Sequence, residues 1–196
     1  MRNFKNRYYK RFRMELDLRR WSAPEVRCCS DYRLLSWSPE LVEAHGEVKF
    51  LSFCDELDAV VFPCFSQQAS CVRLMREIAD KDGFIPEATW LAEYVGAGER
   101  LTEYCGTIQA IRVSRHKANL QNIGVTPLHR GRGVAKALLT AALAGLQQVG
   151  VSRASLEVTA ENHQAVSLYR QTGFRSVKTL YKAVEPVVPA NPAAAV

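Results

Sequence analysis

The residues best suited to chemistry in this sequence form one glycine-rich run, RGRGVAK at residues 130–136. The run follows a predicted strand and opens a predicted apolar helix over residues 133–149. Glycines allow the backbone to curl closely, so consecutive amide N–H groups can point into one small volume, and the helix start adds partial positive charge. Arg130, Arg132 and Lys136 add full charges beside it. Together these features predict a binding site for a pyrophosphate group.

Neither common nucleotide motif accounts for this run. The ATP-binding loop requires G-x-x-x-x-G-K-[ST], which the chain does not contain. The dinucleotide fingerprint requires G-x-G-x-x-G, and here Lys136 stands where the third glycine belongs. Two alternatives are left: a pyrophosphate ligand of another class, or a glycine-rich turn that binds nothing.

The same run resembles the acyl-CoA loop of a known superfamily. Arg130-x-x-Gly133-x-Ala135 is similar to the pattern Q/R-x-x-G-x-G/A of the GCN5-related N-acetyltransferase (GNAT) superfamily. A second set of residues resembles that superfamily's closing strand and helix in order and spacing: Leu156-Glu157-Val158, Asn162, Ala165, Leu168-Tyr169 and Gly173-Phe174. The resemblance covers residues 119–184, and two motifs at the right separation are more specific than one glycine loop.

This resemblance implies a fold and a cosubstrate. The fold is a single α/β domain with flanking helices and a mixed central sheet of about seven strands, two of which splay apart as an acyl-CoA cleft. The cosubstrate is acetyl-CoA, and no metal is expected. The residues expected to bind acetyl-CoA are Ile123, Gly124, Val125, Arg130, Gly131, Arg132, Gly133, Val134, Ala135, Lys136 and Asn162. For Asn162, a helix N-cap is the structural alternative.

The implied reaction is direct attack of a primary amine on the thioester of acetyl-CoA. Tyr169 occupies the family position for the acid that assists the leaving thiolate. A tyrosine near pKa 10 is a weaker acid than a thiol near 8.5, so full proton donation is uphill by about 2 kcal/mol. We therefore expect Tyr169 to donate a hydrogen bond to the developing thiolate charge. A core tyrosine beside Leu168 is the alternative.

The general base is the least determined part of the predicted site. Some family members carry a glutamate where this chain has Asn119, which cannot accept a proton usefully. Glu157 is the main candidate, because its spacing to Tyr169 resembles the ribosomal-protein alanine N-acetyltransferase branch. His163 and Glu103 are lesser candidates. The alternative for Glu157 is a solvated or ion-paired side chain.

The absence of a glutamate at position 119 also affects which acceptor amine we expect. Neutralising a lysine amine at pH 7 costs about 4.6 kcal/mol, whereas an α-amine near pKa 7.8 costs about 1 kcal/mol. A site with one mediocre base therefore favours an α-amine or small-amine acceptor, that is, a small molecule or a peptide N-terminus. A non-catalytic CoA-binding or interaction module on the same fold is the alternative function.

Hydrophobic patterning predicts the elements that must position these residues. Apolar and charged residues alternate from Phe12 to Arg19, which is typical of a half-buried strand. Residues 38–82 read as mainly helical, with Ser38 as a cap before Pro39 and a second helix over 67–81. Further strands are predicted over 89–95, 105–113, 119–125, 154–159 and 175–184, and a helix over 162–172 that ends at Gly173.

Length and charge predict one domain with tails. The chain has 196 residues, of which 47% are hydrophobic and 23% charged. We expect a basic, flexible leader over residues 1–11, a domain over 12–185 and a disordered Pro/Ala-rich tail over 186–196. Six of the 26 basic residues lie within residues 1–13, which contain no acid. Such a leader could contact nucleic acid, although a solvated segment is the preferred interpretation.

Other features exclude several classes of protein. No apolar run approaches the roughly 20 residues of a membrane span, and the N-terminus does not resemble a secretory signal, so we expect a cytoplasmic protein that does not act at a membrane. The six cysteines form no Cys-x-x-Cys pair, which argues against a metal site. The apolar stretch over 57–65 could line a pocket or a dimer face, so a homodimer stays open.

Overall fold

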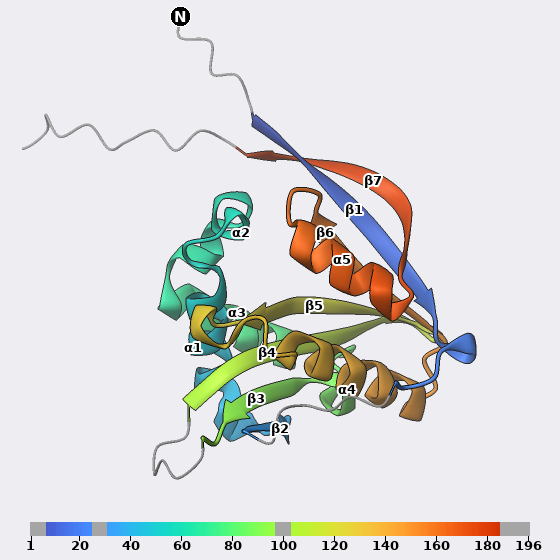
Figure 1. Ribbon diagram of the computed structural model, residues 1–196, viewed down its shortest axis with the longest axis horizontal. Coiled ribbons are helices and arrows are strands. Elements are labelled where there is room, and N and C mark those ends of the chain that lie inside the picture. Colours follow the sequence, from blue (N-terminus) through green and yellow to red (C-terminus); the bar gives the residue numbers. More distant parts are fainter. Residues whose placement is uncertain (1–6, 25–30, 97–102, 185–196) are drawn as a thin grey trace, which may run out of the picture.

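The computed structural model describes residues 7–24, 31–96 and 103–184 of the protein. Its centre is a seven-stranded sheet in the order β2-β3-β4-β5-β6-β1-β7 (Figure 1). The strands are β1 Arg7–Asp17, β2 Tyr32–Ser36, β3 Trp90–Tyr94, β4 Glu103–Ser114, β5 Lys117–Val125, β6 Arg153–Thr159 and β7 Arg175–Val184. The mixed α/β sheet with flanking helices confirms the predicted fold class.

Strand β1 lies inside the sheet, although it is the first element of the chain. It pairs antiparallel with β6 on one side and antiparallel with β7 on the other. All neighbouring strands are antiparallel except β5 and β6, which run parallel. The first and last strands of the described chain therefore lie side by side, as Figure 1 shows.

Helices cover both faces of the sheet. They are α1 Val42–Phe53, α2 Leu57–Val61, α3 Gln68–Ala79, α4 Val134–Gln148 and α5 His163–Thr172. Neighbouring residues of a strand point to opposite faces. A Cβ at Gly106 of β4 would meet Leu138 of α4, whereas the hydroxyl of Thr107 contacts His45 of α1. Helices α1 and α4 therefore pack on opposite faces of β4.

The main hydrophobic core joins the sheet to α4 and α5. The leucines of α4, among them Leu138, Leu139 and Leu143, are fully buried, and Met14 of β1 and Phe174 lie in the same cluster. Burying one such side chain stabilises the fold by about 2 kcal/mol. The alternation over 12–19 predicted this arrangement, because its apolar residues are the core-facing side of β1.

The structure also corrects several expectations. Strand β1 begins at Arg7, so the expectation of a flexible leader is wrong for residues 7–11, which are paired with β7. Residues 1–6 and the predicted tail, 186–196, lie outside the described residues. Strand β2 was not predicted. Ser38 makes no capping bond to the helix backbone, although Pro39 does open a short 3₁₀ turn that precedes α1.

The helices and the potential metal ligands give two further findings. Within the ranges that the structure describes, no helix is long and apolar enough to cross a bilayer. The same residues include no group of three or more His, Cys, Asp or Glu side chains placed to hold a metal ion.

A buried lysine lies under the sheet on α1. Lys49 is fully buried, and its Nζ contacts the Sδ of Met75 at 3.7 Å. Burial lowers the pKa of Lys49 from 10.5 to about 7, against the opposing influence of the nearby Cys71 and Cys64. Between these two pH values the unfolded chain binds a proton that the folded chain does not, so stability should rise with pH.

We predict that Lys49→Met stabilises the protein at pH 7 and that its advantage shrinks as pH rises towards 10. Methionine fills similar space without a charge, so the cost of keeping the amine neutral disappears. The difference in unfolding free energy between variant and wild type should fall by roughly 1.4 kcal/mol per pH unit over this window. Urea unfolding at several pH values measures this difference in free energy. A pH-independent difference would contradict the lowered pKa of Lys49.

Candidate active site

Two adjoining cavities lie where β5 and β6 separate. The first, which we call the loop cavity, has a volume of about 500 Å³ and is bordered by the 130–136 run and by α5. The second, the strand cavity, has a volume of about 460 Å³ and lies between β1, β5, β6 and α2. Both are lined by Phe53, Asp58, Ile123, Asn162, Ala165 and Tyr169. These shared residues mark the junction of the two cavities.

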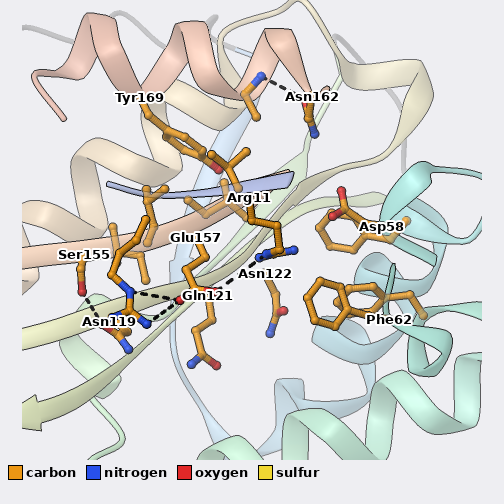
Figure 2. A pocket seen from close by; sticks show the side chains of 18 of the residues that line it. Arg11, Asp58, Phe62, Asn119, Gln121, Asn122, Ser155, Glu157, Asn162 and Tyr169 are labelled. Atoms are coloured by element: carbon orange, nitrogen blue, oxygen red, sulfur yellow. Dashed lines mark hydrogen bonds and ion pairs between the residues drawn. The ribbon is translucent and has the colours of Figure 1, made fainter. Parts of the chain in front are cut away.

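The separation of β5 from β6 creates this junction. The two strands pair over only three positions, the last of which joins Asn119 to Ser155. The hydroxyl of Ser155 donates a hydrogen bond to the Asn119 side-chain oxygen at that point (Figure 2). Beyond it, the side of β5 that faces β6 has no neighbouring strand to pair with. The prediction that two central strands splay apart is confirmed.

A β-bulge deforms β5 at the mouth of the junction. Thr107 pairs with Gly124 and Gln109 with Gln121, so two residues of β5, Asn122 and Ile123, oppose one residue of β4. Asn122 has a φ of 51°, a left-handed conformation that asparagine tolerates better than most residues. The bulge takes backbone groups out of the β4 ladder and leaves them beside the cavities.

Buried hydrogen bonds brace the bulge from below. The side-chain Nδ2 of Asn122 donates to Oε1 of Gln109 at 3.1 Å, and Nε2 of Gln109 donates to the Thr107 hydroxyl at 2.5 Å. The Nδ1 of His45 lies 2.7 Å from the same Thr107 hydroxyl. Burial, aided by the charge of Lys49, lowers the pKa of His45 to about 3, so this ring is neutral. The chain of bonds fixes Asn122 in its unusual conformation.

The 130–136 run forms an open cradle of backbone amides. Gly131 and Gly133 have φ values of 75° and 85°, which only glycine adopts readily. Gly133 is the N-cap of α4 and offers no side-chain cap. Within the described residues, the N–H groups of Val134, Ala135 and Lys136 have no backbone acceptor. Unpaired amides at a helix start that lines a cavity fit a phosphate ligand.

The cationic side chains of this run do not all face the loop cavity. Lys136 and Arg130 both line it, but the guanidinium of Arg130 donates to the carbonyl oxygens of Val125 and Ser52 and is paired with Glu56 at 2.5 Å. Arg130 therefore braces α1 against β5, and its charge is largely used inside the protein.

Arg132 departs further from the prediction. It is not among the side chains that line the loop cavity. Burial raises the pKa of Tyr32, and a hydrogen bond from Arg132 opposes this effect, which places the guanidinium beside the Tyr32 hydroxyl. The Tyr32 hydroxyl also lies 2.9 Å from Nδ1 of His129. Lys136 lines the loop cavity and makes no ion pair in the described structure. It is the only one of the three predicted cations that meets both conditions there.

Tyr169 points from α5 into the junction (Figure 2). It is 7% exposed and packs edge-on against Phe174 at a ring-centroid distance of 6.0 Å. Burial raises the pKa of Tyr169 far above its usual range, and the charge of Asp58 raises it further. The phenol therefore keeps its proton at any physiological pH and can act as a hydrogen-bond donor.

Comparison with known proteins identifies the family of this chain. The model of the Acetyltransferase (GNAT) family matches residues 55–174, more than half of the chain. The chain belongs to the GNAT family. The predicted resemblance is therefore confirmed, and the match extends well before the start of the resemblance at residue 119.

Individual relatives support the same conclusion. A mycothiol acetyltransferase of Pseudarthrobacter chlorophenolicus is 33% identical over 121 residues, which cover 60% of this chain and 37% of that protein. The N-alpha-acetyltransferase RimI of Mycobacterium tuberculosis is 37% identical over 86 residues, 43% of this chain and 52% of that protein. This chain therefore matches only about a third to a half of these relatives' lengths.

Solved structures show the same fold. The crystal structure of a GCN5-related N-acetyltransferase from Sphaerobacter thermophilus superposes with a TM-score of 0.66 at 22% identity. The superposition covers 93% of this chain and 54% of that one. At this level of identity the likeness concerns the fold alone.

In this GNAT protein, Glu157 lies in the strand cavity but is ion-paired. One carboxylate oxygen accepts hydrogen bonds from Nε and Nη2 of Arg13 at 3.1 and 2.8 Å. The other oxygen lies 3.8 Å from Nε of Arg11 (Figure 2). Both oxygens of the carboxylate thus face guanidinium groups, so the ion-paired alternative describes its contacts.

Asn162 makes the cap that its position predicted. Its side-chain oxygen accepts a hydrogen bond from the Ala165 amide at 3.0 Å, so it caps α5. It lines both cavities, and its side chain lies near Asp58, whose pKa it lowers slightly against the effect of burial. Asn162 therefore acts as the N-cap of α5, and its contact with acetyl-CoA stays a prediction.

Sequence reasoning missed Asp58 altogether. This carboxylate projects from α2 into the junction, opposite Tyr169 (Figure 2). Burial raises the pKa of Asp58, against the nearby charge of Arg11 and a hydrogen bond from Thr159. A signal existed in the sequence, since Asp58 is the sole charged residue within the apolar stretch 57–65. That stretch lines the strand cavity through Asp58, Phe62 and Phe65 and buries Ala59 and Val61.

We predict that Gly133→Asp lowers the affinity for acetyl-CoA about a hundredfold or more, because a carboxylate would stand against the pyrophosphate. A side chain at Gly133 would meet no protein atom within 4 Å, so steric conflict within the protein does not explain a loss. Isothermal titration calorimetry with acetyl-CoA measures the effect.

A matched control is Gly150→Asp at the other end of α4. Gly150 has a φ of 75° and equally open surroundings, but it lines neither cavity. This variant carries the same backbone strain and the same charge and should bind normally. Equal affinities in the two variants would refute the assignment of the loop.

Proposed function

We propose that this protein transfers an acetyl group from acetyl-CoA to a primary amine by direct attack of the amine on the thioester. The observation that carries the proposal is the junction itself. A cradle of unpaired amides opens onto a gap between two diverging strands, and a protonated tyrosine lines both sides of the gap. The loop cavity would take the cosubstrate and the strand cavity the acceptor.

The loop cavity has the groups that acetyl-CoA requires. The amides of residues 133–136 and Lys136 would hold the pyrophosphate. Backbone groups of Ile123 and Val125 would meet the pantetheine arm, since the side of β5 that faces β6 has no strand partner there. Gly124 faces α1 so closely that a Cβ would lie 2.8 Å from Ser52, which explains the glycine and leaves backbone contact as its role.

Charge develops at two atoms during the reaction, the thioester oxygen and the leaving sulfur. A backbone amide released by the bulge at Asn122 and Ile123 would stabilise the oxyanion. Tyr169 would donate a hydrogen bond to the sulfur without giving up its proton, since its raised pKa makes full transfer still less favourable than for an ordinary tyrosine.

The attacking amine must lose a proton, and we infer that Asp58 receives it. A carboxylate with a raised pKa is a stronger base than an ordinary aspartate, and Asp58 lies where the two cavities meet. The paired Glu157 would instead order the two arginines of β1. The base therefore comes from the helical half of the chain rather than from β6.

An α-amine is the acceptor class that these features support. Its proton costs about 1 kcal/mol to remove at pH 7, within the reach of one half-buried carboxylate. Among the relatives, one is named an N-alpha-acetyltransferase. A small molecule and a peptide N-terminus both fit this class.

We predict that the protein releases free thiol from acetyl-CoA when given α-amines, and that Tyr169→Phe lowers kcat about tenfold to a hundredfold while acetyl-CoA affinity stays within about twofold. Free thiol is followed with a chromogenic disulfide over amino acids, amino acid amides, peptides, polyamines and aminoglycosides. Tyr181→Phe, at a tyrosine that is 67% exposed, is the control. Acetyl-CoA binding without thiol release from any amine would favour the non-catalytic module instead.

We predict that Asp58→Asn lowers kcat about a hundredfold at pH 7 and that the deficit shrinks above pH 8, where an α-amine already enters neutral. Asp55→Asn, which removes an exposed carboxylate three residues earlier, should leave the rate unchanged. Glu157→Gln should change KM more than kcat. A pH-independent deficit in Asp58→Asn, or a larger kcat loss in Glu157→Gln, would assign the proton transfer elsewhere.

A further inference from the structure

Arg11 is a buried cation with too few partners. It is 7% exposed, yet a guanidinium carries five N–H donors. Its Nη1 makes one long hydrogen bond, 3.4 Å to the Thr159 hydroxyl, and its buried Nε has no hydrogen-bond partner among the described residues. Its Nε is thus an unsatisfied buried donor, although a buried charge ordinarily has paired and hydrogen-bonded surroundings.

The fold holds this guanidinium firmly in place. Arg11 lies on β1 between β6 and β7, and its guanidinium stacks over the ring of Phe62 at 4.7 Å from the ring centre. Lys182 of β7 lies over the same ring at 5.0 Å. Phe62 is thus flanked by two cations, and Arg11 projects into the strand cavity (Figure 2).

The cations around the strand cavity are unequally paired. Arg11, Arg13, Asp58 and Glu157 line it, and Lys182 lies outside the lining, over the Phe62 ring. Arg13 already donates two hydrogen bonds to Glu157, which leaves Arg11 with a contact of 3.8 Å to that carboxylate. An additional anionic group in this cavity would satisfy Arg11.

Arg11 and Asp58 also form a spaced pair of opposite charges. Arg11 Nη1 and Asp58 Oδ1 each lie 3.4 Å from the Thr159 hydroxyl, and they make no direct ion pair. The two atoms are therefore at most 6.8 Å apart, the sum of those distances. An acceptor that carries an amine and a carboxylate close together presents the complementary pair of charges.

Given the proposed function, on which this inference rests, we propose that Arg11 binds a carboxylate of the acceptor while Asp58 receives the proton of its amine. The acceptor class is an α-amine with a carboxylate a few bonds away. Two sources share this chemistry: a free amino acid, and a peptide whose acidic residue lies next to its N-terminus. Arg11 lines the strand cavity and not the loop cavity, which argues against a contact with the phosphates of the cosubstrate.

Matched acceptors test the proposal in the wild-type protein. L-leucine is compared with L-leucinamide, and the peptide Ala-Glu-Ala amide with Ala-Gln-Ala amide, by thiol release at saturating acetyl-CoA. We expect kcat/KM to be about tenfold to a hundredfold higher for the acid of at least one pair, which also identifies the source. Equal kcat/KM within both pairs would overturn the proposal.

Variants then assign the effect to Arg11. Arg11→Gln should raise KM for the preferred acid about tenfold to a hundredfold and leave KM for its amide unchanged. Arg11→Lys, which keeps the charge but loses the planar fork, should lie between the two. Lys10→Gln removes an equal charge from the adjacent, exposed position on the opposite face of β1 and should behave as wild type. An equal loss for acid and amide in both Arg11 variants would show a structural role.

A binding measurement separates this proposal from the proposed function. L-leucine and L-leucinamide are titrated into the wild-type protein saturated with CoA, which cannot react. If no amine in the panel is acetylated, the proposed function fails, whereas preferential binding of the acid would still support Arg11 as a carboxylate site. If amines are acetylated but neither binding nor kcat/KM distinguishes acid from amide, this proposal alone fails.

Discussion

The three-residue pairing between β5 and β6 is the constraint on which the site depends. Parallel strands that stayed paired would use their backbone groups on each other and would close the space between them. Here the pairing ends at Asn119 and Ser155, and the bulge at Asn122 turns β5 away. Because backbone groups in a protein interior need hydrogen-bond partners, such a gap supports the proposal that an extended polar ligand binds there.

The residues around the gap between β5 and β6 come from several distant parts of the chain. The glycine cradle at the start of α4 faces one side, and Arg130 ties that region to α1. The buried bonds through Gln109 and Thr107 hold the bulge from below. Helix α5 contributes Tyr169 from above, and α2 brings Asp58 against it. The chemistry is assembled by the tertiary fold, since no single segment contains it.

The sequence predicted the local structure around the loop cavity better than the contacts around the strand cavity, for a physical reason. The cradle at 130–136 and the cap at Asn162 are local structures, set by glycine conformation and by helix-start chemistry, so their residues lie together in the sequence. The same holds for the alternation of β1 from Phe12 to Arg19. By contrast, the contacts of Glu157 with Arg13 span 144 residues and those of Arg130 with Glu56 span 74, and no local pattern encodes them. Strand β2 and the position of β1 within the sheet likewise depend on distant pairing.

The position of β1 has a consequence for how the protein is made. Its neighbours, β6 and β7, are synthesised more than a hundred residues later, so the first strand waits unpaired until nearly all of the described chain has been translated. Contacts of such high sequence separation form slowly. The wall that carries Arg11 and Arg13 therefore closes last, and a nascent chain can complete its amide cradle before the strand cavity has its β1 side.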